Sequence, residues 1–185
     1  MKNKNVICLV QSSILLATAI VFQLIGSKIP GINQLLVGSV INSVLLVVTY
    51  LCGTFYGTAV GVLTPLTALL VGQLKPAMAP FIPFIMIGNC IFVISYGLFL
   101  SKSSYVKYTG VGLGAILKFL FLSLSAKKFI YIFKMNFPAP IAKALAVAMG
   151  TTQLITALIG GVLAIALIEI LVKRTNIIKR KRSAS

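Results

Sequence analysis

Long apolar stretches separated by short breaks constrain this chain more than any other feature. A helix needs roughly 20 apolar residues to cross the hydrocarbon core of a bilayer, and the breaks carry Gly and Pro, which end helices or supply unusual backbone angles. The pattern predicts an all-α integral membrane protein, a compact bundle of six transmembrane helices that forms a single domain over residues 1–185. The expected spans are 6–26, 35–52, 56–73, 81–101, 109–131 and 144–172.

Charge is too scarce for a water-soluble fold. Only 10% of the residues are charged, against roughly 25% in soluble domains. The excess of 17 Lys and Arg over a single acid, Glu169, would suggest nucleic acid in a soluble chain. Here the bases flank the apolar stretches, so we expect the lipid bilayer and no nucleic acid as their partner.

The basic residues also set the expected orientation. Placing both termini in the cytoplasm leaves more Lys and Arg inside than outside, with the segment 173–185 contributing most. We therefore expect a multi-pass protein of the cell membrane, in a bacterial plasma membrane, whose residues 173–185 form a basic cytoplasmic tail. Such a tail flanks the last span and touches anionic head groups; docking to a partner protein is the alternative.

Residues that support catalysis or metal binding are nearly absent. The sequence has no His and no Asp, and its three cysteines are isolated, without a CxxC pattern. A membrane enzyme, a metal centre or a proton relay would need more such groups. We expect no catalytic residue, no metal and no cofactor in this chain. What remains is a protein that binds a solute and depends on partners for energy.

Polar residues inside the predicted spans are the best candidates for a binding site. Counting 1.5 Å per residue from the ends of the spans places five of them at comparable depth, Lys118 near the middle of the membrane and the others in its outer half, where they could face one cavity open to the outside. The side chains of Asn89 and Gln153 can each donate and accept hydrogen bonds, as a heterocyclic ligand requires. For each of them a hydrogen bond to a neighbouring helix is an equal alternative. The five candidate substrate-binding residues are Asn89, Lys118, Thr152, Gln153 and Thr156.

Lys118 is the strongest of these signals. A lysine at the centre of a membrane helix costs roughly 2.5–3.5 kcal/mol, and the only acid, Glu169, lies near the opposite end of the last span. Lys118 must therefore reach the interface, lose its proton, bind backbone carbonyls or meet an anion from elsewhere. A ligand carboxylate would suit it, and structural snorkelling is the alternative.

Two further patterns need an interpretation. Gln73 and Lys75 begin a loop with three prolines that leads into the fourth span, near the expected cavity; the loop is either a lid or a rigid turn. Gly53, Gly57 and Gly61 recur every fourth residue at the start of the third span. Such spacing lets another helix approach closely, so we expect internal packing there.

Four segments together resemble a group of substrate-binding S components of energy-coupling-factor (ECF) vitamin transporters. Most specific is the Pro-Phe-Ile-x-x-Gly-Asn pattern that ends at Asn89, and the size and basic ends of the chain agree. The resemblance extends over nearly the whole sequence. The segments are 36–42, 61–65, 80–89 and 117–120.

The resemblance implies a function and partners. S components capture a vitamin or related micronutrient from outside and deliver it through a transmembrane coupling subunit and two ATP-binding subunits, which alone hydrolyse ATP. In that family, two small residues four apart on the first helix contact the coupling subunit. Ser13 and Ala17 match this spacing, with Ser in place of the usual first Ala. The alternatives are a small passive channel and a structural subunit of a membrane complex.

Overall fold

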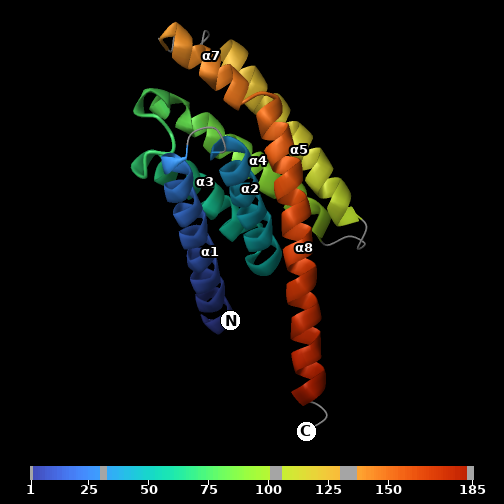
Figure 1. Ribbon diagram of the computed structural model, residues 1–185. Coiled ribbons are helices and arrows are strands. Elements are labelled where there is room, and N and C mark those ends of the chain that lie inside the picture. The colour runs from blue at the N-terminus through green and yellow to red at the C-terminus, as the bar shows by residue number, and fades with distance from the viewer. Residues whose placement is uncertain (1, 30–32, 101–105, 130–136, 183–185) are drawn as a thin grey trace.

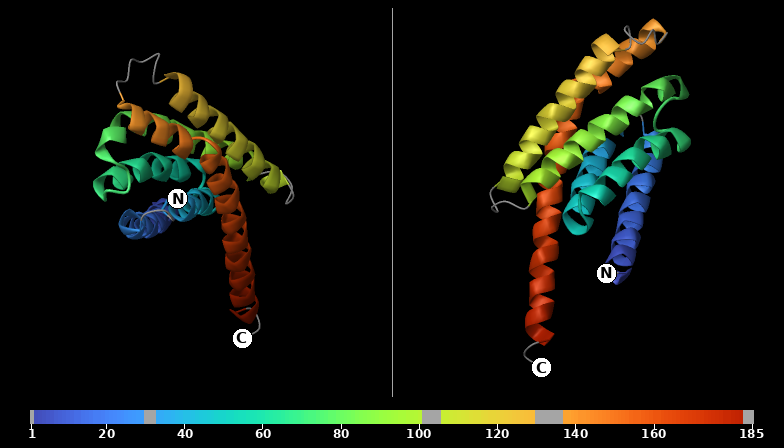
Figure 2. Two further views of the ribbon diagram at one scale, coloured as in Figure 1. Left: turned by 45° about the horizontal axis from the view of Figure 1, so that its top comes forward. Right: turned by 180° about the vertical axis from the view of Figure 1, so that it is seen from behind.

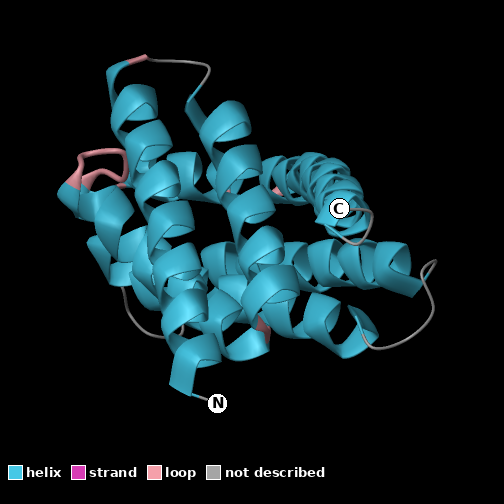
Figure 3. Cartoon of the chain, turned by 90° about the horizontal axis from the view of Figure 1, so that it is seen from below, coloured by secondary structure: helices cyan, strands magenta, loops and turns pink. Residues whose placement is uncertain are grey.

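A computed structural model describes residues 2–29, 33–100, 106–129 and 137–182. Within these ranges the chain is nearly all helix, with short turns and no strand (Figure 3). The all-α prediction is therefore confirmed. In chain order the elements are α1 (Lys2–Lys28), α2 (Asn33–Cys52), α3 (Thr54–Leu70), η1 (Pro76–Phe81), α4 (Ile82–Leu100), α5 (Val106–Leu124), η2 (Ser125–Phe129), α7 (Ala139–Ala148) and α8 (Thr151–Arg182).

The helices form one bundle, with the N- and C-terminal ends of the chain at the same end of it (Figure 1). Helix α2 packs on α8. Helix α4 packs on α5, and these two helices lie side by side in the right-hand view of Figure 2. Helix α1 lies at the edge: 11% of its apolar span is buried, against 56% for α2. The centre of the bundle is therefore built around α2, and α1 offers a free face.

Five helices of the described chain are long and apolar enough to cross a membrane. The third predicted span is the shortest, since α3 has 17 residues and a length of about 26 Å at 1.5 Å per residue. It ends where Gly72 adopts φ +76°, a backbone angle that suits glycine. This helix stops a little short of the roughly 30 Å of a hydrocarbon core.

The segment predicted as the last span, 144–172, contains an interruption of the helix. The helix is interrupted at Met149 and Gly150, which separate α7 from α8. At the end of α7 the Met149 N–H still donates to the Leu145 carbonyl at 2.8 Å. Both residues at the break are compatible with an apolar span, so hydropathy did not mark it. Helix α8 then continues to Arg182, so the basic segment predicted to follow the span includes the end of the same helix.

The glycine spacing in α3 serves two purposes. A Cβ built on Gly57 would collide with the Thr49 side chain, and one on Gly61 would lie 3.2 Å from Cβ of Asn89. These two glycines let α3 approach α2 and α4, as predicted. Gly53 differs, because it has open space around it and a φ of +91° at the N-terminal end of α3. It forms the tight turn from α2.

Candidate functional site

A cavity of about 310 Å³ lies at the end of the bundle opposite both chain ends. The C-terminal parts of α1 and α3 and the N-terminal parts of α2, α4 and α8 line it. Lys118 of α5, helix α7, and the segment from the end of α3 into η1 complete the lining. Its volume is near the lower end of the range for ligand sites. The lining residues are Gln23, Gln34, Gly38, Ile41, Asn42, Thr64, Pro65, Ala68, Gln73, Leu74, Lys75, Met78, Ile85, Asn89, Lys118, Ala144, Ala148, Met149 and Gln153.

Lys118 of α5 is the buried cation of this cavity, with 3% of its surface exposed. Its Nζ donates to Oδ1 of Asn42 at 2.6 Å and to Oδ1 of Asn89 at 2.8 Å, and it lies 5.4 Å from the centre of the Phe92 ring. Both oxygens belong to neutral amides. An ammonium has three N–H donors, and the third has no acceptor among the described residues. The lysine is therefore solvated by dipoles, without an acid beside it.

The orientation of Asn89 follows from a proline in α3. Pro65 has no N–H, so the Gly61 carbonyl one turn earlier loses its helical partner. Asn89 replaces it: its Nδ2 donates to Gly61 O at 2.9 Å and to Thr64 Oγ1 at 3.3 Å. With its nitrogen held by α3, the amide presents its oxygen to Lys118. The backbone hydrogen bond that α3 lacks at Pro65 thus orients a side chain of α4.

This arrangement predicts a moderate effect for Pro65→Ala. The new N–H would bond Gly61 O and compete with Asn89 Nδ2, which would loosen the amide. Because the Thr64 contact and the ammonium remain, we expect an affinity for the bound solute about three- to tenfold weaker, or roughly 1 kcal/mol. Titration of the purified variant checks this, and unchanged affinity would mean that the packing of α4 alone orients Asn89.

Asn42 is held from the other side by α8. Its Nδ2 donates to Thr156 Oγ1 at 3.4 Å, and the Thr156 hydroxyl donates to the carbonyl of Gln153 at 3.1 Å. The contact needs a very close approach of the two helices. Gly160 provides it, since a Cβ there would lie 2.6 Å from both Ser39 O and Cβ of Asn42. The two amides around Lys118 are thus fixed by α3 and α8.

Two glutamines complete the polar part of the wall. Gln23 is fully buried; its Nε2 donates to Thr64 O at 2.9 Å, and its Oε1 accepts from Thr67 Oγ1 at 2.9 Å. Gln34 Nε2 donates to the carbonyl of Ala148 at 3.1 Å, at the last residue of α7, where a helix leaves carbonyls unsatisfied. These contacts tie α1 to α3 and α2 to α7.

Most of the predicted site residues come together. Asn89, Lys118 and Gln153 line the cavity, and so do Gln73 and Lys75 of the loop. Two predicted residues differ from these. Thr156 is buried behind Asn42, and Thr152 lies outside the lining, where its hydroxyl donates to Val147 O at 3.2 Å.

Sequence reasoning missed Asn42 as a member of the site, although it is a polar residue within a predicted span. It missed Gln23 and Gln34 because both lie near span ends, where polar side chains are common.

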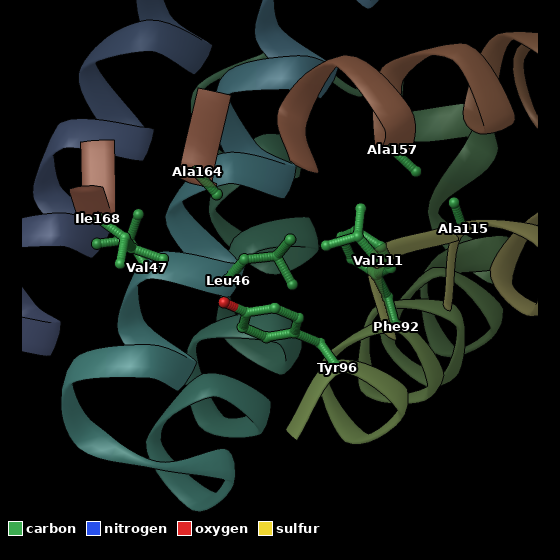
Figure 4. Packing of buried hydrophobic residues seen from close by; sticks show 9 residues of the cluster. All are labelled: Leu46, Val47, Phe92, Tyr96, Val111, Ala115, Ala157, Ala164 and Ile168. Carbon is green, nitrogen blue, oxygen red and sulfur yellow. The ribbon is translucent and has the colours of Figure 1, made fainter. Parts of the chain in front are cut away.

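The floor of the cavity is apolar. A cluster of nine buried residues begins one helical turn below the polar contacts: Leu46 follows Asn42, Phe92 follows Asn89, and Ala115 precedes Lys118 (Figure 4). In Figure 4 the Tyr96 ring lies beside Leu46 within this cluster. The cluster consists of Leu46, Val47, Phe92, Tyr96, Val111, Ala115, Ala157, Ala164 and Ile168.

Comparison with known proteins identifies the family. The family model described as ECF transporter, substrate-specific component, matches residues 8–172. The chain belongs to this family. The resemblance found in the sequence is confirmed, and with it a multi-pass membrane protein that acts as the substrate-specific subunit of an ECF transporter. No curated protein and no solved structure matches the chain.

The cavity and the exposed face of α1 can be compared with the tasks of ECF substrate-specific components. Subunits of this family bind a small molecule and associate with the other subunits of the transporter. The cavity offers a place for the first task. Ser13 and Ala17 are both exposed on α1, the helix with the least buried span.

Proposed function

We propose that this substrate-specific component captures a small, vitamin-like micronutrient from outside in the cavity around Lys118. It then passes the solute inward with a transmembrane coupling subunit and two ATP-binding subunits. The observation that carries the proposal is a polar hollow with a buried cation in a member of this family. The cavity lies at the end of the bundle away from both termini, which agrees with six crossings and cytoplasmic termini.

The described residues argue against the alternative of a passive channel. A channel needs a continuous polar lining, whereas the nine-residue apolar cluster lies directly below Asn42, Asn89 and Lys118. Solute held above this floor cannot pass until helices move apart. A purely structural subunit has no need for a buried lysine, which costs free energy in a membrane helix. A gated carrier that depends on partners fits both features.

Transport by reconstituted proteoliposomes tests the proposal. The chain alone should bind solute without passing it, and the chain with the coupling subunit and the two ATP-binding subunits should accumulate it only when ATP is present. Uptake by the chain alone without ATP would favour the channel. Absence of saturable binding in every preparation would favour the structural subunit.

The docking face on α1 gives a separate prediction. Replacing Ala17 with Phe adds a large side chain to the exposed stripe with Ser13, where the coupling subunit is proposed to approach closely. We expect ATP-dependent uptake to fall at least tenfold, with solute affinity unchanged because neither residue lines the cavity. Copurification of the tagged chain with the coupling subunit measures the effect. As a matched control, Leu98→Phe changes an exposed residue of α4 and should leave copurification intact.

A further inference from the structure

The charges around the cavity specify the ligand more closely. Resting on the proposed function, we infer that the ligand is a small molecule with a single negative charge, a monocarboxylate with an aliphatic body. Its carboxylate lies against Lys118, beside the oxygens of Asn42 and Asn89. The inference depends on the charge balance, on the burial of the lysine and on the nature of the walls.

Within the described part of the chain, no acidic group lies beside Lys118. The sequence contains one acidic side chain, Glu169, which accepts a hydrogen bond from the Tyr108 hydroxyl at 3.1 Å. It lies sixteen residues beyond Gln153 on α8, about 24 Å along the helix axis. A buried ammonium surrounded only by neutral dipoles is attracted to an anion that enters the cavity. The third N–H of Lys118 is available to donate to that anion.

A second negative charge on the ligand would lack an equivalent partner. Among the described residues of the lining the only other base is Lys75, which is exposed just before η1, and an exposed ion pair contributes little. A phosphate monoester or a dicarboxylate would bring a second buried charge without a second buried cation. A cationic ligand would meet Lys118 as a like charge. The charges of the lining therefore favour a ligand with one negative charge.

The other lining residues indicate the chemical nature of the ligand body. Their apolar part is aliphatic, from residues such as Ile41, Pro65, Leu74 and Ile85, and the described residues of the lining include no aromatic ring. Flat heterocycles bind best where rings stack on them, so the cavity suits a flexible or saturated body. The glutamines at 34 and 153 can meet neutral hydroxyl or amide groups on it.

The experiment separates nutrients by charge, so it works before the ligand has been identified. The small molecules of yeast extract are divided by anion exchange at pH 7 into unretained, monoanionic and polyanionic fractions. Each is added to the purified chain in detergent while thermal unfolding is followed. We expect only the monoanionic fraction to raise the Tm, by about 5 °C at saturating ligand. The ligand released from that sample should not absorb above 250 nm, as an aromatic heterocycle would.

Asn89→Asp tests the role of charge in the same assay. The new carboxylate would keep an oxygen 2.8 Å from Lys118 Nζ, would carry a second oxygen in place of the Nδ2 donor, and would neutralise the lysine internally. The variant should fold and lose the Tm shift; if it does not fold, Asn42→Asp makes the same change from α2. As a control, Lys28→Met removes an exposed charge at the same end of the bundle, outside the lining, and should keep the full shift.

The outcomes distinguish this inference from the proposed function. A Tm shift with the unretained or polyanionic fraction, an aromatic ligand, or a full shift in the folded Asp variants would overturn the inference and leave the proposed function standing. Failure of all three fractions to stabilise the wild type would overturn both.

Discussion

Replacing Lys118 with Met should weaken binding of the solute about 100-fold. Truncating one partner of a buried charge pair costs about 3 kcal/mol, and 1.4 kcal/mol corresponds to a factor of ten in affinity. Met has a similar length and shape, so it fills the place of the aliphatic part of the side chain. Titration calorimetry on wild type and variant in the same detergent measures the change.

The stability of the same variant distinguishes the two interpretations of Lys118. If the lysine mainly joined α2 and α4 through Asn42 and Asn89, its loss would lower the Tm of the solute-free protein. Both asparagines line the cavity, where water can replace the ammonium, so we expect a small change in Tm without ligand. Weak binding together with an unchanged solute-free Tm supports the ligand role. An affinity within threefold of wild type refutes it, and Lys28→Met serves as the matched control.

Gly160→Leu should disrupt the bundle where α8 packs against the backbone of α2. The first atom of the new side chain would lie 2.6 Å from the Ser39 carbonyl oxygen and 3.0 Å from the Ser43 nitrogen. These are backbone atoms of α2 and cannot rotate away. Helices α2 and α8 would have to separate, at a cost of about 3 kcal/mol or more, and Asn42 would lose its contact with Thr156. We expect a Tm lower by about 10 °C and no measurable solute binding.

The control for this prediction is Gly112→Leu on α5. A Cβ at Gly112 meets nothing within 4 Å, so the same substitution in the same kind of helix should change the Tm by only a few degrees. Equal loss of stability in the two variants would show that glycine is needed for a reason other than the contact between α2 and α8. Retained solute binding in Gly160→Leu would contradict the proposed position of Asn42.

The sequence could indicate which polar residues of different helices lie at one level of the bundle, but not the direction in which each side chain points around its helix. Counting from span ends placed Lys118, Asn89 and Gln153 at one level, and all three line one cavity. Thr152 was placed at the same level, but it is one position away from Gln153. Adjacent residues of an α-helix differ by about 100° around the axis, and Thr152 lies outside the lining.

Other features depend on contacts that no local pattern reveals. The break at Met149 and Gly150 joins apolar residues, so hydropathy is continuous across it. The role of Pro65 could be recognised only once Asn89 was found beside the carbonyl that the proline leaves free. Asn42 offered a signal, since an amide in the second span is costly in lipid. Its contact with Lys118 is between residues 76 positions apart in sequence.

The most direct measurement is the small-molecule content of the purified protein. Mass spectrometry of material released from the chain on denaturation should find one organic solute at a ratio approaching one per chain in the wild type, and much less in Lys118→Met. Repeated preparations in which no solute accompanies the wild type, or equal amounts accompany both proteins, would contradict a solute-binding cavity built around Lys118.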